Sequence, residues 1–402
     1  MMPSSDSIVI CAEVYSSNLG DGVIVESLRY LINSFHSDFE IKLVDLSCRK
    51  GFGLSEYDKP SPWKNIYNQF AKRSSEFRTV SSLATWYSFW RNKHRSYFLN
   101  QMKDSKLLII GGGQLLNDNN LFFPLRIREV VRCANQLGMK IVFHACGVGN
   151  MWSNLGRHFF KEALFSRDII SVSVRDDYSL ENIKKHLPKL EDRVNKACDP
   201  AIWAAEAYDV APKKTSDLVG LGIIAPEVLR RHSVGIKPLT EKNLIQFWIE
   251  LSNSLLKLDQ PFMFFTNGST EDYNFAKKMV SNLDLPSNQK SMLLLDRPKT
   301  PKELVADISK FQVVVAYRLH ANIIAFSLKI PSVGLIWDEK VRQFGKESGR
   351  SNFYLEGNSV TPKTVENKIF EAVRCGVNEQ KLEAMKASAM ESVKKVILEA
   401  RR

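Results

Sequence analysis

The chain has 402 residues, of which 44% are hydrophobic and 25% charged, and its formal net charge is +12 at pH 7. This composition excludes a disordered chain and is typical of a globular enzyme with two or more domains. The positive surplus favours anionic partners such as phosphorylated substrates, polyanions or anionic membrane surfaces. For most of the surface, however, the simpler explanation is that the positive charge keeps the protein molecules dispersed.

Targeting, membrane-spanning and metal-binding signals are not expected from this sequence. Met1–Ser7 is polar and lacks a basic region followed by an apolar one, so we expect no signal peptide. No run approaches the ~20 uncharged apolar residues that a membrane-spanning helix needs. The six cysteines are scattered without a CxxC pair, which predicts no disulfide framework, no metal site and a reducing, cytoplasmic location.

Strand-like and helical patterns alternate through the first half of the chain. A run rich in β-branched residues at 7–14 precedes a helical pattern at 20–33. Further strand-like runs lie at 40–47, 106–113, 140–149 and 168–176. Strands separated by helices of this length predict parallel βαβ units with helices on both faces of a sheet.

The alternation is interrupted near residue 205 and then restarts. Strand-like runs follow at 217–226, 261–268, 291–298, 312–319 and 332–338. We therefore expect an α/β protein with an N-terminal Rossmann-like domain over 1–205, a C-terminal one over 216–375, and a C-terminal helix over 376–402. Two doubly wound domains would face a cleft at the carboxyl ends of their strands, where such folds bind ligands.

One segment, residues 63–98, does not fit this alternation. It contains a single acidic residue, and aromatic residues are interleaved with its basic ones. The seven basic residues are Lys64, Lys72, Arg73, Arg78, Arg91, Lys93 and Arg95. Such a helical face can lie on an anionic membrane or bind a polyanion. Alternatively, the segment is an insertion that packs its aromatic residues on its own domain and exposes its bases. Both interpretations remain open.

The first strand-to-helix turn contains Asn18, Gly20 and Asp21. Glycine allows close approach to the backbone, and amide groups at a helix start favour anions. Asp21 can instead cap the helix. The turn is neither a dinucleotide fingerprint nor a phosphate-binding P-loop.

Three glycines, Gly111, Gly112 and Gly113, end the strand-like run at 106–113. A ligand can reach the backbone there because glycine has no Cβ atom. A tight turn would also need small residues, but three in succession at the carboxyl end of a strand favour a ligand.

Cationic residues follow three predicted strands. Arg175 and Arg318 each lie at the carboxyl end of a strand-like run, His320 lies two residues after Arg318, and Lys340 follows the last run. Guanidinium groups suit phosphate or carboxylate, and a neighbouring imidazole can transfer a proton. The alternatives are a salt bridge for Arg175, a packed core histidine for His320 and a helix-surface lysine for Lys340.

These motifs together resemble the polysaccharide pyruvyl transferase family. The matching pieces are "NLGD", "GGGQLLND", "SVRDDYS", "CDPAIW", "RLHANIIAFSLKIPSVGL" and "DEK", in this order between Asn18 and Phe344. Each piece alone is unspecific, whereas their order and their placement at strand ends carry the resemblance. Residues 63–98 and the C-terminal helix lie outside it.

The resemblance implies a fold like that of GT-B glycosyltransferases. It also implies transfer of pyruvate from phosphoenolpyruvate to a sugar diol, which forms a pyruvate ketal and releases phosphate. The acceptor would belong to a surface polysaccharide, such as an exopolysaccharide or capsule, or to its lipid-linked precursor. Arg175, Arg318 and Lys340 would bind the donor anions, and His320 would be the general acid. No cofactor and no nucleic acid are expected.

Two other functions remain open at this stage. A GT-B-like glycosyltransferase would share the fold and use a nucleotide sugar, whose phosphates also need cations. A non-catalytic glycan- or membrane-associated protein could have kept the fold without activity. Phosphate release from phosphoenolpyruvate in the presence of an acceptor separates these alternatives from pyruvyl transfer. A peripheral contact at the inner face of the membrane is compatible with each of them.

Overall fold

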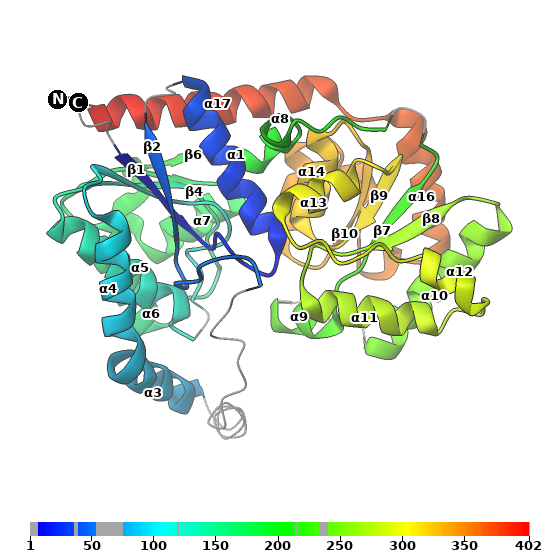
Figure 1. Cartoon of the computed structure of the whole chain (residues 1–402), viewed down its shortest axis with the longest axis horizontal. Coiled ribbons are helices and arrows are strands. Elements are labelled where there is room, and N and C mark those ends of the chain that lie inside the picture. The colour runs from blue at the N-terminus through cyan, green and yellow to red at the C-terminus, as the bar shows by residue number, and fades with distance from the viewer. Residues whose placement is uncertain are drawn as a thin grey trace. The chain divides into compact units, whose positions relative to one another are not determined.

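The structure is a computed structural model. It describes residues 7–35, 39–53, 75–118, 120–213, 216–232 and 240–401. The chain forms two compact units. Unit 1 comprises Met1–Ser16, Leu28–Asp199 and Met390–Arg402, and unit 2 comprises Ser17–Ser27 and Pro200–Ala389. Each unit contains one parallel sheet with helices packed against it (Figure 1).

Unit 1 has a six-stranded sheet in the order β2-β1-β3-β4-β5-β6. Its strands are β1 (Ser7–Ala12), β2 (Glu40–Asp45), β3 (Leu107–Gly111), β4 (Lys140–Cys146), β5 (Ile169–Val174) and β6 (Val194–Lys196). The chain adds β2 on one side of β1 and β3 to β6 on the other. The order therefore reverses between β1 and β3, and that is where doubly wound sheets bind ligands.

Several helices connect these strands. They are α1 (Leu19–Phe35), α3 (Ser75–Thr85), the π-helix η2 (Trp86–Trp90), α4 (Arg91–Met102), α5 (Phe122–Gln136), α6 (Asn154–Leu164), α7 (Asp177–His186) and the 3₁₀ helix η3 (Pro188–Arg193). α4 packs against α5, and α5 packs against α6. Part of the 63–98 segment thus forms α3, η2 and α4, and residues 63–74 lie outside the described residues.

The core of unit 1 explains why its strands are so apolar. Every residue of β1 is buried. Val9 and Cys11 share a core with Phe98 of α4, Phe143 of β4 and Phe160 of α6. A parallel strand covered on both faces needs apolar side chains at every position rather than at alternate ones. This is the pattern that makes such strands visible in the sequence.

Unit 2 has a five-stranded parallel sheet in the order β11-β10-β9-β7-β8. Its strands are β7 (Val219–Gly222), β8 (Phe262–Phe265), β9 (Val313–Ala316), β10 (Ser332–Ile336) and β11 (Tyr354–Glu356). Here the order reverses between β7 and β9. The carboxyl end of β9 is therefore the expected ligand-binding edge of this sheet.

The helices of unit 2 cover both faces of its sheet. They are η4 (Pro200–Trp203), α8 (Ala204–Tyr208), α9 (Pro226–His232), α10 (Glu241–Lys257), α11 (Thr270–Ser281), α12 (Ser287–Met292), α13 (Pro301–Ile308), α14 (Leu319–Ser327), α15 (Glu339–Glu347), η5 (Ser351–Phe353), η6 (Gly357–Ser359) and α16 (Pro362–Cys375). The last helix, α17 (Glu379–Arg401), belongs to unit 2 as far as Ala389 and to unit 1 from Met390. α13 packs with α14, and α10 packs with α16. Figure 1 shows α13 and α14 on one side of the sheet and α16 on the other.

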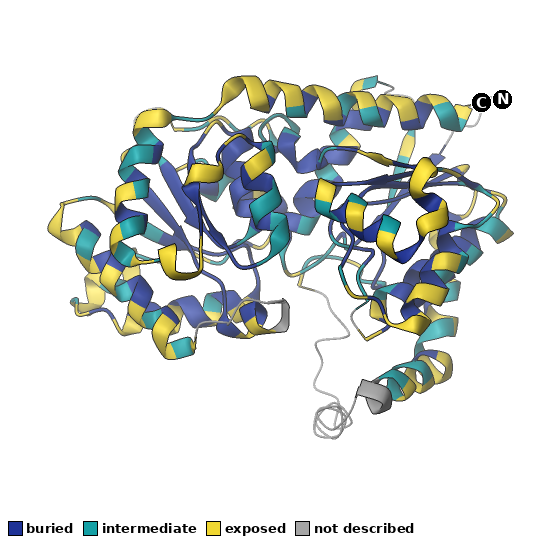
Figure 2. Ribbon diagram, turned by 180° about the vertical axis from the view of Figure 1, so that it is seen from behind, coloured by how far each residue is buried: buried dark blue, intermediate teal, exposed yellow. Residues whose placement is uncertain are grey.

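Both sheets are buried, and the outward faces of the helices are exposed (Figure 2). Capping residues explain where several of these helices begin. The hydroxyl of Thr300 accepts from the amide of Glu303, and Pro301 occupies the first turn of α13. In the described part of the chain, no helix is long and apolar enough to cross a membrane.

The prediction of a strand at 291–298 is wrong. Its first residues belong to α12, and only Leu294 pairs with a neighbouring strand, through an isolated bridge to Phe264. Pro298 lacks an N–H group and cannot extend such pairing. The short strands β6 and β11 were not expected, because three residues at a sheet edge carry too little pattern to be recognised.

Candidate functional site

The strands at which each sheet reverses end in predicted motifs. β3 ends at Gly111, and two further glycines follow it. β9 ends at Ala316, Arg318 directly precedes α14, and His320 lies in the first turn of that helix. Each group belongs to its own unit and is described by itself. We call them the β9 group, formed by Asn18, Gly20, Asp21, Arg318 and His320, and the β3–β5 group, formed by Gly111, Gly112, Gly113, His144 and Arg175.

Arg318 is anchored by a buried carboxylate. It donates from Nε and Nη2 to Oδ2 of Asp272, at 3.1 and 2.6 Å. Asp272 is fully buried and accepts from the amide of Ala225 through Oδ1, at 2.8 Å. A guanidinium has five N–H donors, and these bonds use two of them. The carboxylate therefore fixes the orientation of Arg318 while leaving donors that suit an anion.

His320 lies against the start of α1. A methyl group at Gly20 would lie 2.5 Å from Cβ of His320 and 2.7 Å from its Nδ1. His320 itself is buried in the first turn of α14. The structure thus brings together two motifs from opposite ends of the sequence, and glycine is required at position 20 because no side chain fits there.

The other predicted residues of this turn hold the helix start. Asn18 directly precedes α1, and its side-chain amide donates to Oδ2 of Asp21 at 3.3 Å. The amide of Leu19 donates to the carbonyl of Asn267 at 2.9 Å. Asp21 lies in the first turn, where a carboxylate interacts favourably with the helix dipole. It does not occupy the position before the helix.

Lys340 is engaged by its own helix start. Asp338 caps α15, and its carboxylate pairs with Nζ of Lys340 at 3.1 Å. The ammonium also lies 5.1 Å from the ring of Trp337, whose indole donates to the carbonyl of Tyr317 at 2.7 Å. Lys340 is therefore linked to the residue that follows β9, and its charge is partly balanced by Asp338.

The loop after β8 supplies polar residues that the sequence analysis missed. Thr266 and Asn267 are buried, and neither Oγ1 of Thr266 nor Nδ2 of Asn267 has a hydrogen-bond partner in the described part of the chain. A methyl group at Gly268 would lie 2.5 Å from Leu19, so this loop touches the start of α1. Buried polar groups of this kind usually meet water or a ligand. The signal was the polar run "TNGST" directly after the apolar β8.

In unit 1, the three glycines make a turn that only glycine fits. Gly112 and Gly113 have φ values of 80° and 78°. A methyl group at Gly111 would lie 2.6 Å from the carbonyl oxygen of His144 on the neighbouring strand. The tight-turn explanation therefore accounts for all three residues, whatever else the turn binds.

Arg175 lies between two carboxylates. It donates from Nε to Asp176 at 3.2 Å and from Nη1 to Asp199 at 3.4 Å, and all three side chains are buried. Asp176 also caps α7 by accepting from the amide of Ser179 at 2.7 Å. The salt bridge that was the alternative to anion binding by Arg175 is thus present. Two carboxylates around one guanidinium leave a net negative charge, which weakens the attraction for a further anion.

His144 is a second histidine that the sequence analysis missed. It lies on β4, is 1% exposed, and neither ring nitrogen has a hydrogen-bond partner among the described residues. Burial lowers the pKa of His144 to about 4, although nearby Asp199 acts in the opposite direction. The imidazole is therefore neutral at pH 7. Its position inside an apolar run gave no signal in the sequence.

Comparison with known proteins gives a family and a fold. The model of the family described as polysaccharide pyruvyl transferase matches residues 18–339. A search of the curated proteins found no match. Among the described residues, no group of His, Cys, Asp or Glu side chains could hold a metal ion.

Solved structures with similar architecture are GT-B enzymes. The UDP-GlcNAc 2-epimerase of Methanocaldococcus jannaschii has a TM-score of 0.53 at 11% identity, covering 98% of each chain. MnaA of S. aureus, solved with UDP, has a TM-score of 0.52 at 10% identity, covering 98% of this chain and 95% of its own. At these identities the likeness shows the GT-B fold alone.

Proposed function

The chain belongs to the polysaccharide pyruvyl transferase family, and from this premise we propose that it transfers pyruvate from phosphoenolpyruvate to a sugar diol. The products are a pyruvate ketal and inorganic phosphate. The observation that carries the proposal is the β9 group. There an anchored guanidinium and an imidazole follow the strand at which the sheet of unit 2 reverses.

The donor requires cations because it carries a carboxylate and a phosphate. In the proposal, Arg318 binds one of these groups through the donors that Asp272 does not use. The amide groups at the start of α14 and the ammonium of Lys340 add positive potential near this strand end. Arg175 of unit 1 is proposed to bind an anionic group of a substrate, with Asp176 and Asp199 holding its guanidinium in place.

His320 is proposed as the general acid. Its proton goes to the methylene carbon of phosphoenolpyruvate, and the C=C electrons form the new C–H bond. The neighbouring carbon becomes cationic, and an oxygen of one sugar hydroxyl attacks it and loses its proton. A positioned acid of this kind typically contributes about 100- to 10,000-fold to a rate.

The second half of the reaction closes the ketal. The bond between carbon and the phosphate oxygen breaks, the phosphate leaves with its electron pair, and the second hydroxyl attacks the cationic carbon. One of the two hydroxyl protons restores His320, and the other passes to phosphate or water. Neither step needs a cofactor, a metal or an oxidant.

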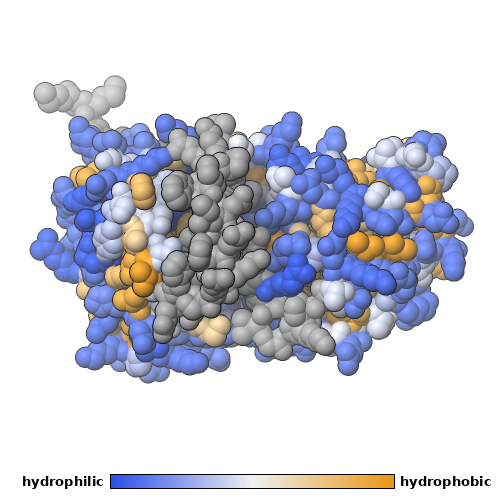
Figure 3. All heavy atoms as spheres, turned by 90° about the horizontal axis from the view of Figure 1, so that it is seen from below, coloured by the Kyte–Doolittle hydropathy of each residue, from blue (hydrophilic) through white to orange (hydrophobic). Residues whose placement is uncertain are grey.

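The acceptor is proposed to be a sugar of a surface polysaccharide, an exopolysaccharide or capsule, or its lipid-linked precursor. The reaction would take place in the cytoplasm, and α3, η2 and α4 would contact the inner face of an anionic membrane. Three apolar side chains of these helices are exposed: Val80 by 65%, Tyr87 by 48% and Phe89 by 75%. Figure 3 shows hydrophobic side chains among hydrophilic ones on this face of unit 1.

The structure also limits the electrostatic part of this contact. Arg91 and Arg95 both pair with the buried carboxylate of Glu129, at 3.3 and 3.0 Å. Part of the basic charge of this segment is therefore satisfied within the unit. The remaining bases and the exposed apolar residues would share the binding to lipid.

Phosphate release tests the proposed reaction. The protein is incubated with phosphoenolpyruvate and candidate glycan acceptors, and inorganic phosphate and the mass of the acceptor are measured together. Pyruvyl transfer predicts acceptor-dependent phosphate and a product heavier by one pyruvate ketal. Phosphate release without acceptor, or no release with any glycan of the source organism's surface, would contradict the proposal.

A further inference from the structure

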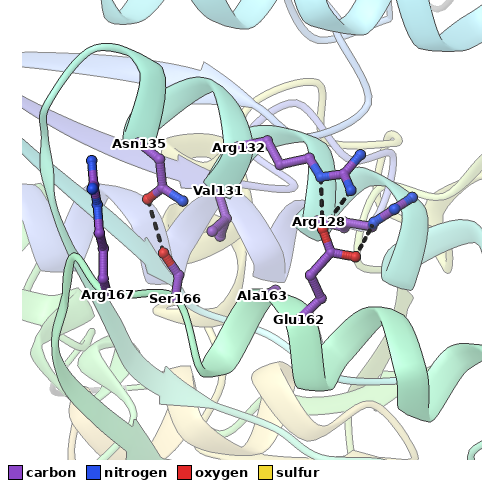
Figure 4. A pocket seen from close by; sticks show the side chains of 8 residues that line it. All are labelled: Arg128, Val131, Arg132, Asn135, Glu162, Ala163, Ser166 and Arg167. Carbon is purple, nitrogen blue, oxygen red and sulfur yellow. Dashed lines mark hydrogen bonds and ion pairs between the residues drawn. The ribbon is translucent and has the colours of Figure 1, made fainter.

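Unit 1 contains a pocket on its helix layer that the proposed reaction does not use. It has a volume of about 380 Å³ and lies between the second half of α5 and the end of α6 (Figure 4). A volume in this range suits a small ligand. The lining residues are Arg128, Val131, Arg132, Asn135, Glu162, Ala163, Ser166 and Arg167.

Guanidinium groups dominate the charge of this pocket. Three arginines and one carboxylate line the pocket. The carboxylate of Glu162 accepts from Nε of Arg128 and Nε of Arg132, both at 2.7 Å. The side chain of Arg167 is 85% exposed and pairs with Asp168 at 3.5 Å. The three arginines, Glu162 and the neighbouring Asp168 together carry a net charge of +1. Two guanidinium groups carry about ten N–H donors between them, more than one carboxylate can accept.

The pocket has polar ends and an apolar centre. Figure 4 shows Arg128, Arg132 and Glu162 at one end and Asn135, Ser166 and Arg167 at the other, with Val131 and Ala163 between them. The hydroxyl of Ser166 donates to Oδ1 of Asn135 at 2.9 Å, which turns the amide nitrogen of Asn135 into a further available donor. Donors at both ends and apolar atoms between them suit an anion that carries a small organic group.

The surroundings of Arg128 hold its guanidinium rigidly. Nη1 donates to the hydroxyl of Tyr87 at 3.0 Å, and the guanidinium lies 4.7 Å from the ring of Phe159. A guanidinium fixed on three sides loses little freedom when it binds an anion. Through Tyr87, the pocket also adjoins the exposed aromatic residues of η2.

The position of the pocket separates it from the strand-end motifs. Its residues belong to the second half of α5, to the last turn of α6 and to the turn before β5. They therefore lie toward the amino ends of β4 and β5. Gly111 ends β3, and Arg175 and Asp199 follow β5 and β6, so these residues lie at the carboxyl ends of the strands of the same sheet.

We propose that this pocket is an anion-binding site, separate from the donor site, for a phosphomonoester or phosphodiester with a small organic group. The guanidinium forks of Arg128 and Arg132 bind the phosphate, as such forks bind phosphate bidentately. Val131 and Ala163 contact the organic group. The phosphate comes either from a soluble ester or from a lipid headgroup, since the two share this chemistry.

Calorimetric titration with glycerol 3-phosphate tests the site, with glycerol as the uncharged reference. Arg132→Gln and Arg167→Gln should each weaken binding, the former by about tenfold or more, because a charge-assisted hydrogen bond is lost. Glu162→Gln should strengthen binding, since it removes the competing carboxylate. Arg193→Gln, at an exposed arginine of η3, is the matched control and should leave binding unchanged.

Binding at the proposed donor site has a different dependence. Any glycerol 3-phosphate bound there should respond to Arg318→Lys and not to Arg132→Gln. Thermal melting of each variant checks that the fold is retained. Binding that is insensitive to Arg132→Gln, Arg167→Gln and Glu162→Gln in folded proteins would overturn the proposal.

Vesicle flotation distinguishes the two sources of phosphate. Phosphatidylcholine vesicles with phosphatidic acid are compared with pure phosphatidylcholine vesicles, for the wild type and for Arg132→Gln. Capture that depends on both phosphatidic acid and Arg132 identifies a lipid headgroup. Dependence on Arg132 for glycerol 3-phosphate alone identifies a soluble ester. No dependence on Arg132 in either experiment would show that the pocket does not bind phosphate.

Discussion

His320 is the residue whose role the structure makes most testable. If it is the general acid, His320→Gln should lower turnover about 100- to 10,000-fold while donor affinity changes far less. If the buried histidine serves only packing, its replacement should instead lower the melting temperature. Turnover would then fall only in step with the folded fraction.

Turnover, donor affinity and melting temperature should therefore be measured on the same preparation of His320→Gln. His158→Gln, at an exposed histidine of α6, is the control. A well-folded His320→Gln protein with near-normal turnover would remove the general-acid role.

Arg175 should behave differently from a residue that only binds substrate. Arg175→Ala leaves the buried carboxylates of Asp176 and Asp199 without their cation. Removing one partner from a buried ion pair typically costs about 3–5 kcal/mol of unfolding free energy. Urea unfolding should show a loss of this size for Arg175→Ala and almost none for Arg193→Ala. Equal stability of the two variants would show that the ion pairs contribute little.

At the scale of elements, the start of α1 is the feature that controls His320. Alanine in place of glycine normally stabilises a helix by about 0.5–1 kcal/mol. Gly20→Ala should do the opposite, because its methyl group would overlap the imidazole. We expect lower turnover in acceptor-dependent phosphate release, with Ser34→Ala at the exposed end of α1 as control. Unchanged turnover in Gly20→Ala would mean that the imidazole can shift without consequence.

The proposed membrane contact would depend on the π-helix η2. Phe89 is exposed, whereas Trp86 is buried in a small core with Leu125 and Phe159. Phe89→Ser should therefore weaken association with anionic vesicles without unfolding the unit, and salt should weaken it further. Co-sedimentation at low and high salt measures both effects. Equal recovery on neutral and anionic vesicles would argue against a membrane-binding role.

The elements also show what the sequence can and cannot predict. Buried parallel strands such as β1, β3 and β9 were predictable because both of their faces are apolar. Their ends placed Gly111 and Arg318 correctly at the carboxyl ends of β3 and β9. The approach of Gly20 to His320 was not predictable, since no local pattern joins positions so far apart. The carboxylate of Asp199 beside Arg175 was missed for the same reason, whereas the buried imidazole of His144 was missed because it lies inside an apolar run.

At the scale of the whole molecule, buried histidines should make the protein sensitive to acid. Burial lowers the pKa of His144 to about 4 and that of His94 to about 3, and it also lowers the pKa of His186. The unfolded chain binds protons near pH 6.5, so it takes up more protons than the folded chain between these values. The contribution of these neutral histidines to the free energy of unfolding should therefore be fully present above about pH 6.5. It should decrease as the pH drops toward 4.

His144 alone should account for roughly 3 kcal/mol of this loss, because its pKa changes from 6.5 to about 4. Urea unfolding at neutral pH and near pH 4 measures the loss. His144→Leu should reduce the pH dependence, whereas His158→Leu, at the exposed histidine, should leave it unchanged. The same acid sensitivity in both variants would show that His144 does not cause it.

The division of α1 between the units has a consequence for how this protein can change over evolution. Residues 17–27 belong with residues 200–389, although the rest of unit 1 surrounds them in the sequence. Recombination at a single point near residue 200 would give a hybrid whose His320 faces the α1 start of a different parent. Gly20 and His320 must therefore be inherited together. The halves of such a chain are not interchangeable modules, even though each has a sheet of its own.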